Sequence, residues 1–327
     1  MSKKVTILYF KALDLKLGKK ISPVMAIIHP TNRCNHRCPG CEYANILGKA
    51  SIENICDVID QLTELGIVSV LFTGGGEPTL HPSFANALLR AKENNLSIGI
   101  FSNGTTLNGP LCDIIADNAD FIRISIDAAT KETFQGVRGV PGKNLESVRK
   151  GIVSLLSKRD DKPEVGLKFL IRKTNLHEII PFGEFGKSLG VDSIQFKPIR
   201  QSEVDLDEGE TEAAISMIDE LKARYPGFVQ GGIKPIKATV PCWITPLRVL
   251  IDAEGKVFLC NYFNHRRDSH CIGSLGQKRL TDIWFSKRHI EALKNIRPEE
   301  CCLFDCRFHS LNAELQELVK QRSFDFV

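Results

Sequence analysis

The sequence predicts an α/β protein: a partial (β/α)6 barrel followed by a small C-terminal α+β domain. Apolar strand-like runs alternate with helix-like segments from Met25 to about Arg200, and this alternation is typical of a parallel sheet. A stretch punctuated by proline and glycine follows, and a hairpin signal begins a second unit near Pro241. We therefore expect an N-terminal extension over residues 1–22, the barrel over 23–200, a linker with a helix over 201–240, and the small domain over 241–327.

Six strand-helix units account for the barrel. We expect its strands at Met25–His29, Val68–Thr73, Ser97–Ser102, Phe121–Ile126, Val165–Ile171 and Ser193–Lys197. Among the intervening helices, Ile52–Leu65 places Ile55, Ile59 and Leu62 at core-facing spacing, and Phe84–Asn94 follows the second strand. Right-handed crossovers set successive strands side by side, so chemistry should gather where the strands end.

The linker and the small domain are predicted from local signals. A helix is expected around Thr211–Arg224 in the linker. Leu247–Ile251 and Lys256–Leu259 flank a turn that ends in Gly255, where a positive φ angle is available. A second helix is expected from Leu280 to Asn295.

Composition describes an ordinary globular chain. It has 327 residues, 43% of them hydrophobic and 25% charged, with a net charge of +4 that forms no long basic block, so we expect no nucleic-acid partner. No stretch approaches the roughly 20 apolar residues of a membrane span, and no secretory signal opens the chain, so we expect a cytoplasmic protein. The weakly amphipathic Val5–Lys20 should pack on the protein's own body, with contact to a membrane surface as the alternative.

The grouping of the eleven cysteines indicates metal sites. In a cytosolic enzyme of this length, grouped cysteines hold metal more often than they form disulfides. Three lie within eight residues near the N-terminus, Cys56 and Cys112 stand alone, and the rest fall between Cys242 and Cys306. We therefore expect two metal-binding groups.

The first group is one short loop after the first strand, with Cys34, Cys38 and Cys41 in CxxxCxxC spacing. Such a loop can wrap one corner of a cubane cluster, and Cys56 falls on the apolar face of the next helix, so one iron is left open to an outside ligand. A zinc knuckle or a closed electron-transfer cluster is the alternative, with His36 as a candidate fourth ligand. The position of the loop within a strand-helix array disfavours that alternative.

A glycine loop, Thr73 to Pro78, follows the second strand. Consecutive glycines let the backbone approach a ligand closely, and the carboxylate of Glu77 can accept a hydrogen bond from an ammonium group. Such a loop alone can be a tight turn. One strand after CxxxCxxC, it indicates a cofactor site.

These features together resemble the radical S-adenosylmethionine (SAM) superfamily over about Met25 to Arg200: CxxxCxxC after the first strand, Gly-Gly-Glu-Pro after the second, and six barrel units. The resemblance implies that Cys34, Cys38 and Cys41 hold a [4Fe-4S] cluster, whose open iron is chelated by the amino and carboxylate groups of SAM. It also implies cofactor contacts near the strand ends: Gly75, Gly76 and Glu77 with the amino group, Ser102, Asn103, Ser125 and Asp127 with the ribose or carboxylate, and Lys168 with the carboxylate.

Two points in this site stay open. Ser102, Asn103, Ser125 and Asp127 can also be ordinary polar residues that cap helices. The family's usual aromatic residue before the third cysteine is Gly40 here, so either Tyr43 replaces its contact with adenine or adenine is held differently.

The second cysteine group resembles the SPASM and Twitch domains of the same superfamily. Gly255 and Cys260 match the first element of these domains, and the cysteines are too few for the full SPASM pattern, so the shorter Twitch form is expected. A second [4Fe-4S] cluster would be held by Cys242, Cys260, Cys302 and Cys306, with Cys301 as the alternative to Cys302. Zinc or reduced buried thiols are the plainer reading. A cluster closed by four thiolates would relay electrons and not activate the cofactor.

The resemblance also implies a reaction. An electron from a low-potential donor such as flavodoxin or ferredoxin would cleave SAM to a 5′-deoxyadenosyl radical, which takes a hydrogen atom from the substrate. The leading hypothesis is oxidation or epimerisation of a small-molecule substrate, a sugar, aminocyclitol or nucleoside. The first alternative is modification of a ribosomal peptide. A non-catalytic electron carrier is the alternative of another class, and it would not need the glycine loop.

Cys271 lies outside the four-ligand set, in a polar segment close to Arg267. A thiol near basic residues can be exposed and reactive, and its S–H bond is weak enough to return a hydrogen atom to a carbon radical. We predict that Cys271 is a catalytic donor if the enzyme is an epimerase. A loop cysteine without a role, or a cluster ligand, are the alternatives.

Overall fold

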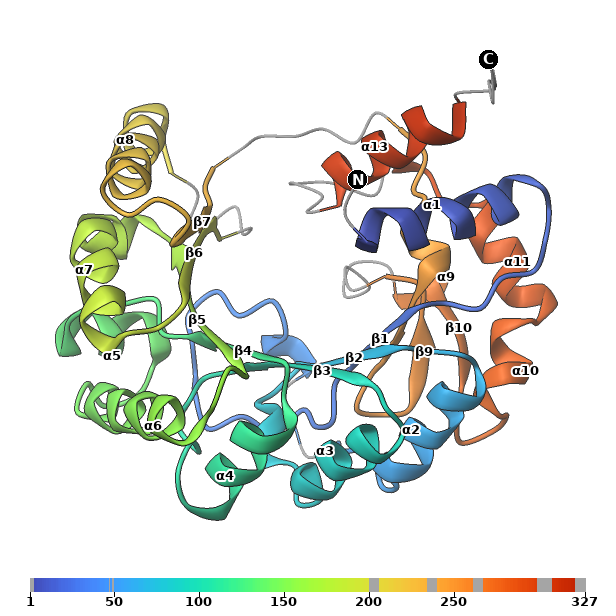
Figure 1. The fold of residues 1–327 in the computed structure, drawn as a ribbon, viewed down its shortest axis with the longest axis horizontal. Helices are drawn as coiled ribbons and strands as arrows, with labels where there is room; N and C mark the ends of the chain where they lie inside the picture. Colours follow the sequence, from blue (N-terminus) through green and yellow to red (C-terminus); the bar gives the residue numbers. More distant parts are fainter. Residues whose placement is uncertain are drawn as a thin grey trace. The chain divides into compact units, whose positions relative to one another are not determined.

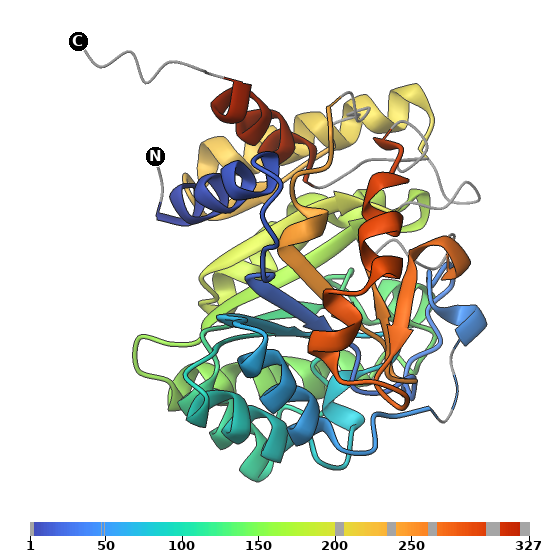
Figure 2. The same ribbon diagram turned by 90° about the vertical axis from the view of Figure 1, so that its right-hand side faces the viewer.

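The computed structural model describes residues 3–46, 48, 50–199, 206–233, 240–260, 267–298 and 308–320. The chain divides into two compact units (Figures 1 and 2). The terminal unit comprises Met1–Ile27, Asp60–Ser69 and Lys234–Val327, and the barrel unit comprises Ile28–Ile59 and Val70–Ile233. The domain boundaries given above stay a prediction.

The barrel unit contains the predicted parallel sheet. Its strand order is β2-β3-β4-β5-β6-β7, and the pairs from β3 to β7 are parallel. These strands are β2 (Ser69–Phe72), β3 (Ser97–Ser102), β4 (Phe121–Ser125), β5 (Glu164–Ile171), β6 (Ser193–Pro198) and β7 (Val229–Gly231), while β1 (Met25–Ile28), the first predicted strand, falls mostly in the terminal unit. The six predicted strands are confirmed to within one residue at each end.

Helices cover the outer side of this sheet (Figure 1). They are α3 (Phe84–Glu93), α4 (Gly109–Asn118), α5 (Lys131–Arg138), α6 (Asn144–Lys158), α7 (Ile179–Leu189) and α8 (Glu208–Arg224), with α2 (Ile55–Glu64) before them. Phe169 of β5 packs against Phe182 of α7 with ring centroids 4.8 Å apart, and Phe196 of β6 joins them at 5.4 Å from Phe169. Because side chains alternate along a strand, Lys168 and Gln195 lie on the opposite face. The helix predicted in the linker is α8, and it leads into a seventh parallel strand.

The terminal unit contains the predicted hairpin. Its strand order is β10-β9-β8-β1, and both β8–β9 and β9–β10 are antiparallel. The elements are α1 (Lys3–Lys16), β8 (Arg248–Ile251), β9 (Lys256–Phe258), α9 (Arg267–His270), β10 (Cys271–Ser274), α10 (Leu280–Trp284), α11 (Lys287–Lys294) and α13 (His309–Lys320). Gly255 has φ +73° in the turn, as predicted, and Asp252 Oδ1 accepts hydrogen bonds from the Glu254 and Lys256 amides at 3.0 and 2.9 Å.

The opening helix packs within the terminal unit. Leu8 and Ala12 of α1 share a buried cluster with Leu315 and Val319 of α13, which confirms that this segment packs on the protein's own body. Across the described ranges, no helix combines the length and apolar character needed to cross a membrane.

The single helix predicted from Leu280 to Asn295 was wrong, because the chain forms α10 and α11 there instead. Ser286 has extended backbone angles, and its hydroxyl accepts a hydrogen bond from the His289 amide at 3.1 Å. A serine that bonds to the third amide after it begins a new helix, so the apolar periodicity continues across a break in the backbone.

Two helical glycines differ in their surroundings and give a stability test. A Cβ on Gly151 of α6 would lie 2.7 Å from the carbonyl oxygen of Leu107, whereas one on Gly136 of α5 would meet nothing within 4 Å. We expect Gly136→Ala to stabilise the protein by about 0.5–1 kcal/mol through helix propensity. Gly151→Ala should destabilise it by about 1–3 kcal/mol, because backbone cannot move aside. Urea unfolding measures both, and shifts in the same direction would contradict this packing.

Candidate active site

The three N-terminal cysteines lie on the loop that follows β1. Cys34 is exposed, and Cys38 and Cys41 are partly buried. The loop turns tightly: the Cys41 amide donates to the Cys38 carbonyl at 3.3 Å, and the Ala44 amide donates to the Cys41 carbonyl at 3.0 Å. The Cys34 sulfur accepts from the His36 amide at 3.4 Å. The thiols therefore sit on a folded loop and not on an extended segment.

The glycine loop lies directly against the start of the cysteine loop. The Gly76 amide donates to the Thr31 carbonyl at 3.0 Å, and the Glu77 amide donates to the Arg33 carbonyl at 2.8 Å. A Cβ on Gly76 would lie 2.1 Å from the Arg33 carbonyl oxygen, and one on Gly75 would lie 2.3 Å from Asn32 Oδ1. Only glycine permits this approach, so the two predicted motifs form one structural site.

The Glu77 carboxylate is buried and already receives four hydrogen bonds. Its Oε1 accepts from the Thr79 amide (3.3 Å), the Thr79 hydroxyl (2.6 Å) and the Ser102 hydroxyl (2.7 Å), while Oε2 accepts from the Asn103 amide (2.6 Å). Burial raises the pKa of Glu77, and these hydrogen bonds act in the opposite direction. Since a carboxylate oxygen offers about two acceptor positions, Oε2 is the atom with room for an ammonium group.

Asn103 connects the end of β3 to the cysteine loop. Its Nδ2 donates to Asn35 Oδ1 at 2.7 Å, and its Oδ1 accepts from the Thr105 amide at 3.0 Å. Asn35 in turn donates to the Thr105 hydroxyl at 2.8 Å. The residue next to Cys34 is thus fixed by Asn103, which the sequence had assigned to the cofactor.

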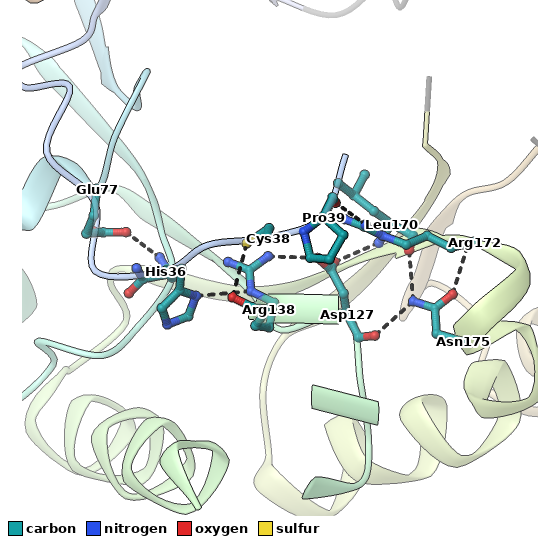
Figure 3. A network of polar contacts seen from close by, with 10 residues as sticks. His36, Cys38, Pro39, Glu77, Asp127, Arg138, Leu170, Arg172 and Asn175 are labelled. Carbon is teal, nitrogen blue, oxygen red and sulfur yellow. Dashed lines mark hydrogen bonds and ion pairs between the residues drawn. The ribbon is translucent and has the colours of Figure 1, made fainter. Parts of the chain in front are cut away.

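Asp127 follows β4, and protein groups bind both of its carboxylate oxygens (Figure 3). Its Oδ2 pairs with Arg138 Nη1 at 2.8 Å, its Oδ1 accepts from the Leu170 amide at 2.7 Å, and its carbonyl accepts from Asn175 Nδ2 at 2.9 Å. Its φ of +61° is a conformation that aspartate tolerates better than most residues. Asp127 therefore supports the site by joining β4, α5 and β5.

Ser125 and Lys168 are register partners on β4 and β5. Both side chains are partly buried and lie on the sheet face opposite the helices. Of the predicted cofactor contacts, these two are the ones placed on that inner face by the strand pattern.

Arg138, which sequence reasoning missed, joins several of these groups (Figure 3). Its Nη1 binds Asp127, and its Nε donates to His36 Nδ1 at 3.2 Å. Its carbonyl accepts from the Arg37 amide at 3.2 Å and from the Cys38 thiol at 3.6 Å. Burial raises the pKa values of Cys34 and Cys38, whereas the charge of Arg138 acts to lower them. The buried guanidinium thus favours the thiolate forms that bind iron.

His36 is part of this support. Burial, aided by the charge of Arg138, lowers the pKa of His36 to about 3, so the ring is neutral and Nδ1 is its acceptor. The ring packs edge-on against Phe134 at 6.0 Å. No three His, Cys, Asp or Glu side chains in the described part of the chain gather closely enough for a single metal ion.

Arg172, after β5, holds the far side of the cysteine loop, and Asn175 holds Arg172. Arg172 Nη1 donates to the Pro39 carbonyl, and the Arg172 amide donates to Asn175 Oδ1 at 2.7 Å (Figure 3). Gly40 has φ +66°, and the Tyr43 ring lies edge-on to His29 at 5.3 Å. No motif marks Arg172, because it meets the cysteine loop only in the folded chain.

In the terminal unit, two predicted ligands of the second cluster have sulfur contacts. Cys242 Sγ lies 3.1 Å from the Thr245 hydroxyl and accepts from Asn312 Nδ2 at 3.7 Å, and Cys260 Sγ accepts from Arg248 Nη2 at 3.7 Å. The predicted ligands Cys302 and Cys306, and the alternative Cys301, lie outside the described residues. This ligand set stays a prediction.

Cys271 is the first residue of β10, paired with Phe258 of β9. Its thiol donates to the Gly273 carbonyl at 3.6 Å, and its carbonyl accepts from Arg288. The neighbouring Arg267 pairs with Asp252 at 3.0 Å. A role for Cys271 as a hydrogen donor stays a prediction.

Comparison with known families matches both parts of the chain. The radical SAM superfamily matches residues 28–179, and SPASM, an iron-sulfur cluster-binding domain, matches residues 242–307. The chain belongs to the radical SAM superfamily and carries a C-terminal SPASM domain. It is therefore a radical SAM enzyme, and the two domains imply [4Fe-4S] clusters and SAM as cofactors. The glycine loop packed on a loop of three thiols fits such a cluster and its cofactor.

Three curated relatives are similar at low identity. The tungsten-containing aldehyde ferredoxin oxidoreductase cofactor-modifying protein of Pyrococcus furiosus is 22% identical over 79% of this chain and 80% of its own. A "Probable GTP 3',8-cyclase" of Methanothermobacter thermautotrophicus is 26% identical over 80% of this chain and 93% of its own. The PqqA peptide cyclase of Granulibacter bethesdensis is 26% identical over 52% and 46%, respectively.

Two solved structures show the same fold. Streptococcus suis SuiB bound to precursor peptide SuiA superposes with a TM-score of 0.69 at 13% identity, covering 87% of this chain and 70% of SuiB. Native anSMEcpe with bound AdoMet and Kp18Cys peptide gives 0.66 at 16% identity, covering 89% and 88%. The predicted α/β barrel followed by an iron-sulfur domain is thus confirmed.

Gly139 tests the contact between α5 and the cysteine loop. It has φ +62°, and a Cβ there would lie 2.1 Å from the Arg37 carbonyl oxygen, whereas Gly190, at φ +75°, has open space. Alanine at either position costs about 1–2 kcal/mol of backbone strain. Only Gly139→Ala should also displace the cysteine loop, so we expect it to lower the iron content after reconstitution while Gly190→Ala does not. Equal iron content in both variants would contradict the contact.

Arg138→Gln should be strongly destabilising, because it leaves the buried Asp127 carboxylate without its charge partner. Loss of one member of a buried pair costs about 3–5 kcal/mol. The matched control is Arg149→Gln, which removes the exposed pair with Glu146 and should leave unfolding unchanged. Urea midpoints measure both, and similar values for the two variants would refute the role given to Arg138.

Proposed function

We propose that this radical SAM enzyme cleaves SAM reductively at the Cys34–Cys38–Cys41 loop and modifies a peptide substrate. The observation that carries the first part is the close packing of the glycine loop on the start of the cysteine loop. When bound, the cluster and SAM supply a 5′-deoxyadenosyl radical that takes a hydrogen atom from the substrate. The protein's task is to hold these groups and to keep water away.

The protein residues divide this task. Cys34, Cys38 and Cys41 would hold the iron, and Arg138 favours their thiolate forms. Glu77 Oε2 is the acceptor for the amino group of SAM, while Asn103 and Asp127 act through the loops that they fix. Lys168, on the inner sheet face, would bind the SAM carboxylate, with Ser125 beside it.

A peptide substrate is supported by several proteins that this chain resembles, which bind or act on peptides. SuiB is bound to a precursor peptide, anSMEcpe is bound to a peptide, and one curated relative is a peptide cyclase. This reading replaces the small-molecule substrate as the first candidate. The SPASM domain would relay electrons, supplied by a donor such as flavodoxin or ferredoxin.

A small-molecule substrate remains the second candidate, and one observation favours it. The GTP 3′,8-cyclase and the cofactor-modifying protein align with this chain over most of both lengths, whereas the peptide cyclase aligns over about half. The two substrate classes can be separated by experiment.

The reactive cluster is tested by cysteine substitution. We expect the anaerobically reconstituted, reduced protein to release 5′-deoxyadenosine from SAM, and Cys34→Ala, Cys38→Ala and Cys41→Ala to release none. Iron should fall from about eight to about four per chain in each variant. The control Cys56→Ala, on α2, should match the wild type. Full cleavage in any of the three loop variants would remove this loop from the mechanism.

The substrate class is tested with extracts of the source organism. We expect a peptide-containing fraction to increase 5′-deoxyadenosine release above the level seen without substrate, because a bound substrate consumes the radical productively. Proteinase K treatment of that fraction, followed by removal of the protease, should abolish the increase. An increase confined to the protease-resistant fraction of low molecular mass would support the second candidate instead.

A further inference from the structure

The inner face of the barrel sheet carries a run of polar side chains on four neighbouring strands. The strand registers align Ser125 of β4 with Lys168 of β5, Lys168 with Gln195 of β6, and Gln195 with Gln230 of β7. All four are partly buried, while the residues beside them in each strand are packed or point to the other face. Because neighbouring strands are about 4.8 Å apart, this row is a continuous polar strip.

Arg123 precedes Ser125 by two residues on β4 and lies on the same face of the sheet. Its side chain extends over β5 toward β7. Its register partner on β5 is Gly166, and a Cβ there would lie 3.2 Å from Arg123 Nε and 3.4 Å from Nη2. Arg123 Nη2 donates to Gln230 Oε1 at 3.2 Å, on β7. The guanidinium therefore lies over the glycine, and its far end reaches the polar strip. A glycine in a central strand is what permits so close an approach.

This guanidinium has no anionic partner among the described residues. Its Nε is buried and has no hydrogen-bond partner, and its one side-chain bond is to the neutral amide of Gln230. Glu164 acts on it through charge but makes no ion pair with it, and its Oε1 accepts from the Ser193 hydroxyl at 3.2 Å. Burial lowers the pKa of Arg123, with Glu164 opposing.

Other arginines near the sites show two ways in which the fold uses such a cation. Arg138 and the partly exposed Arg267 pair with Asp127 and Asp252, respectively. The buried Arg172 donates to the Pro39 carbonyl and forms no ion pair with the described residues. Moving a cation from water into the protein costs free energy unless a partner or a ligand compensates for the lost hydration. Within the described ranges, Arg123 has neither a carboxylate nor a backbone carbonyl as its partner, and it lies on a face that also carries Lys168 and Lys197.

We propose that Arg123, oriented by Gln230, binds an anionic oxygen group of the substrate, a carboxylate or a phosphate, on the inner face of the sheet. A planar guanidinium presents paired donors that match such groups. Lys168 and Lys197 add positive charge on the same face. This inference rests on the proposed function and deepens it, since it names a chemical feature that the substrate must carry.

The two sources of that group correspond to the two substrate candidates. An acidic peptide side chain would supply a carboxylate, and a nucleotide would supply a phosphate. Glutarate and inorganic pyrophosphate are therefore suitable probes. Binding of each is measured by titration calorimetry to the full-length reconstituted protein, without SAM or reductant, so the result does not depend on cofactor cleavage.

We expect saturable binding of at least one probe to the wild type, weakened about tenfold or more in Arg123→Gln, because the variant loses the charged hydrogen-bond donors. Arg123→Lys should retain part of the affinity, and Gln230→Leu should weaken it by releasing the guanidinium. The matched control Arg149→Gln, an exposed arginine on α6, should bind as the wild type does.

Other outcomes overturn the proposal. No binding of either probe to the wild type would do so, as would equal affinity in the wild type and Arg123→Gln. If Arg123→Gln does not fold, Arg123→Lys and Gln230→Leu decide the question, and unchanged affinity in both would reduce Arg123 to a brace between β4 and β7. Release of 5′-deoxyadenosine is assayed separately, so a failed anion site and a failed cofactor site give different results.

Discussion

The buried pair between Arg138 and Asp127 is the interaction on which the candidate active site depends. It joins the end of α5 to the end of β4, and it places the Arg138 carbonyl where the Arg37 amide and the Cys38 thiol both donate to it. A cluster ligated by three thiolates is anionic, and a fixed cation beside the loop compensates that charge. The same residue also holds the loop in place through its hydrogen bonds. The network around Arg138 in Figure 3 therefore holds the cysteine loop in place and keeps a positive charge beside it.

A second consequence concerns the polar residues at the strand ends. Glu77, Asn103 and Asp127 are buried and take most of their hydrogen bonds from the protein. Buried polar groups must be satisfied before a ligand arrives, and groups held in this way do not need to reorganise when it binds. Contacts to SAM at these positions are then restricted to the remaining acceptor capacity, such as that of Glu77 Oε2, and to exposed backbone.

Sequence reasoning located the strands and both motifs because these depend on local pattern. The strand ends were predictable since one face of each strand is packed by helices, and that face fixes the apolar residues. Arg138 and Arg172 were not predictable, because they meet the cysteine loop across about a hundred residues of chain with no shared motif. The break at Ser286 was missed because the apolar periodicity continues across it. A serine just before a helical segment is a known signal for the start of a helix, and Ser286 has this role for α11.

Gly166 shows how a single sequence feature takes its meaning from a partner that only the fold reveals. In the sequence it is an isolated glycine within a predicted strand, which is consistent with a weak strand or a close approach. In the structure, the Arg123 guanidinium lies against this glycine, with Nε 3.2 Å from where a Cβ would be. Paired cations such as Arg138 hold the scaffold, whereas Arg123 forms no ion pair within the described part of the chain. If the proposed anion site is correct, the same residue type serves in this protein both as a brace and as a binding group.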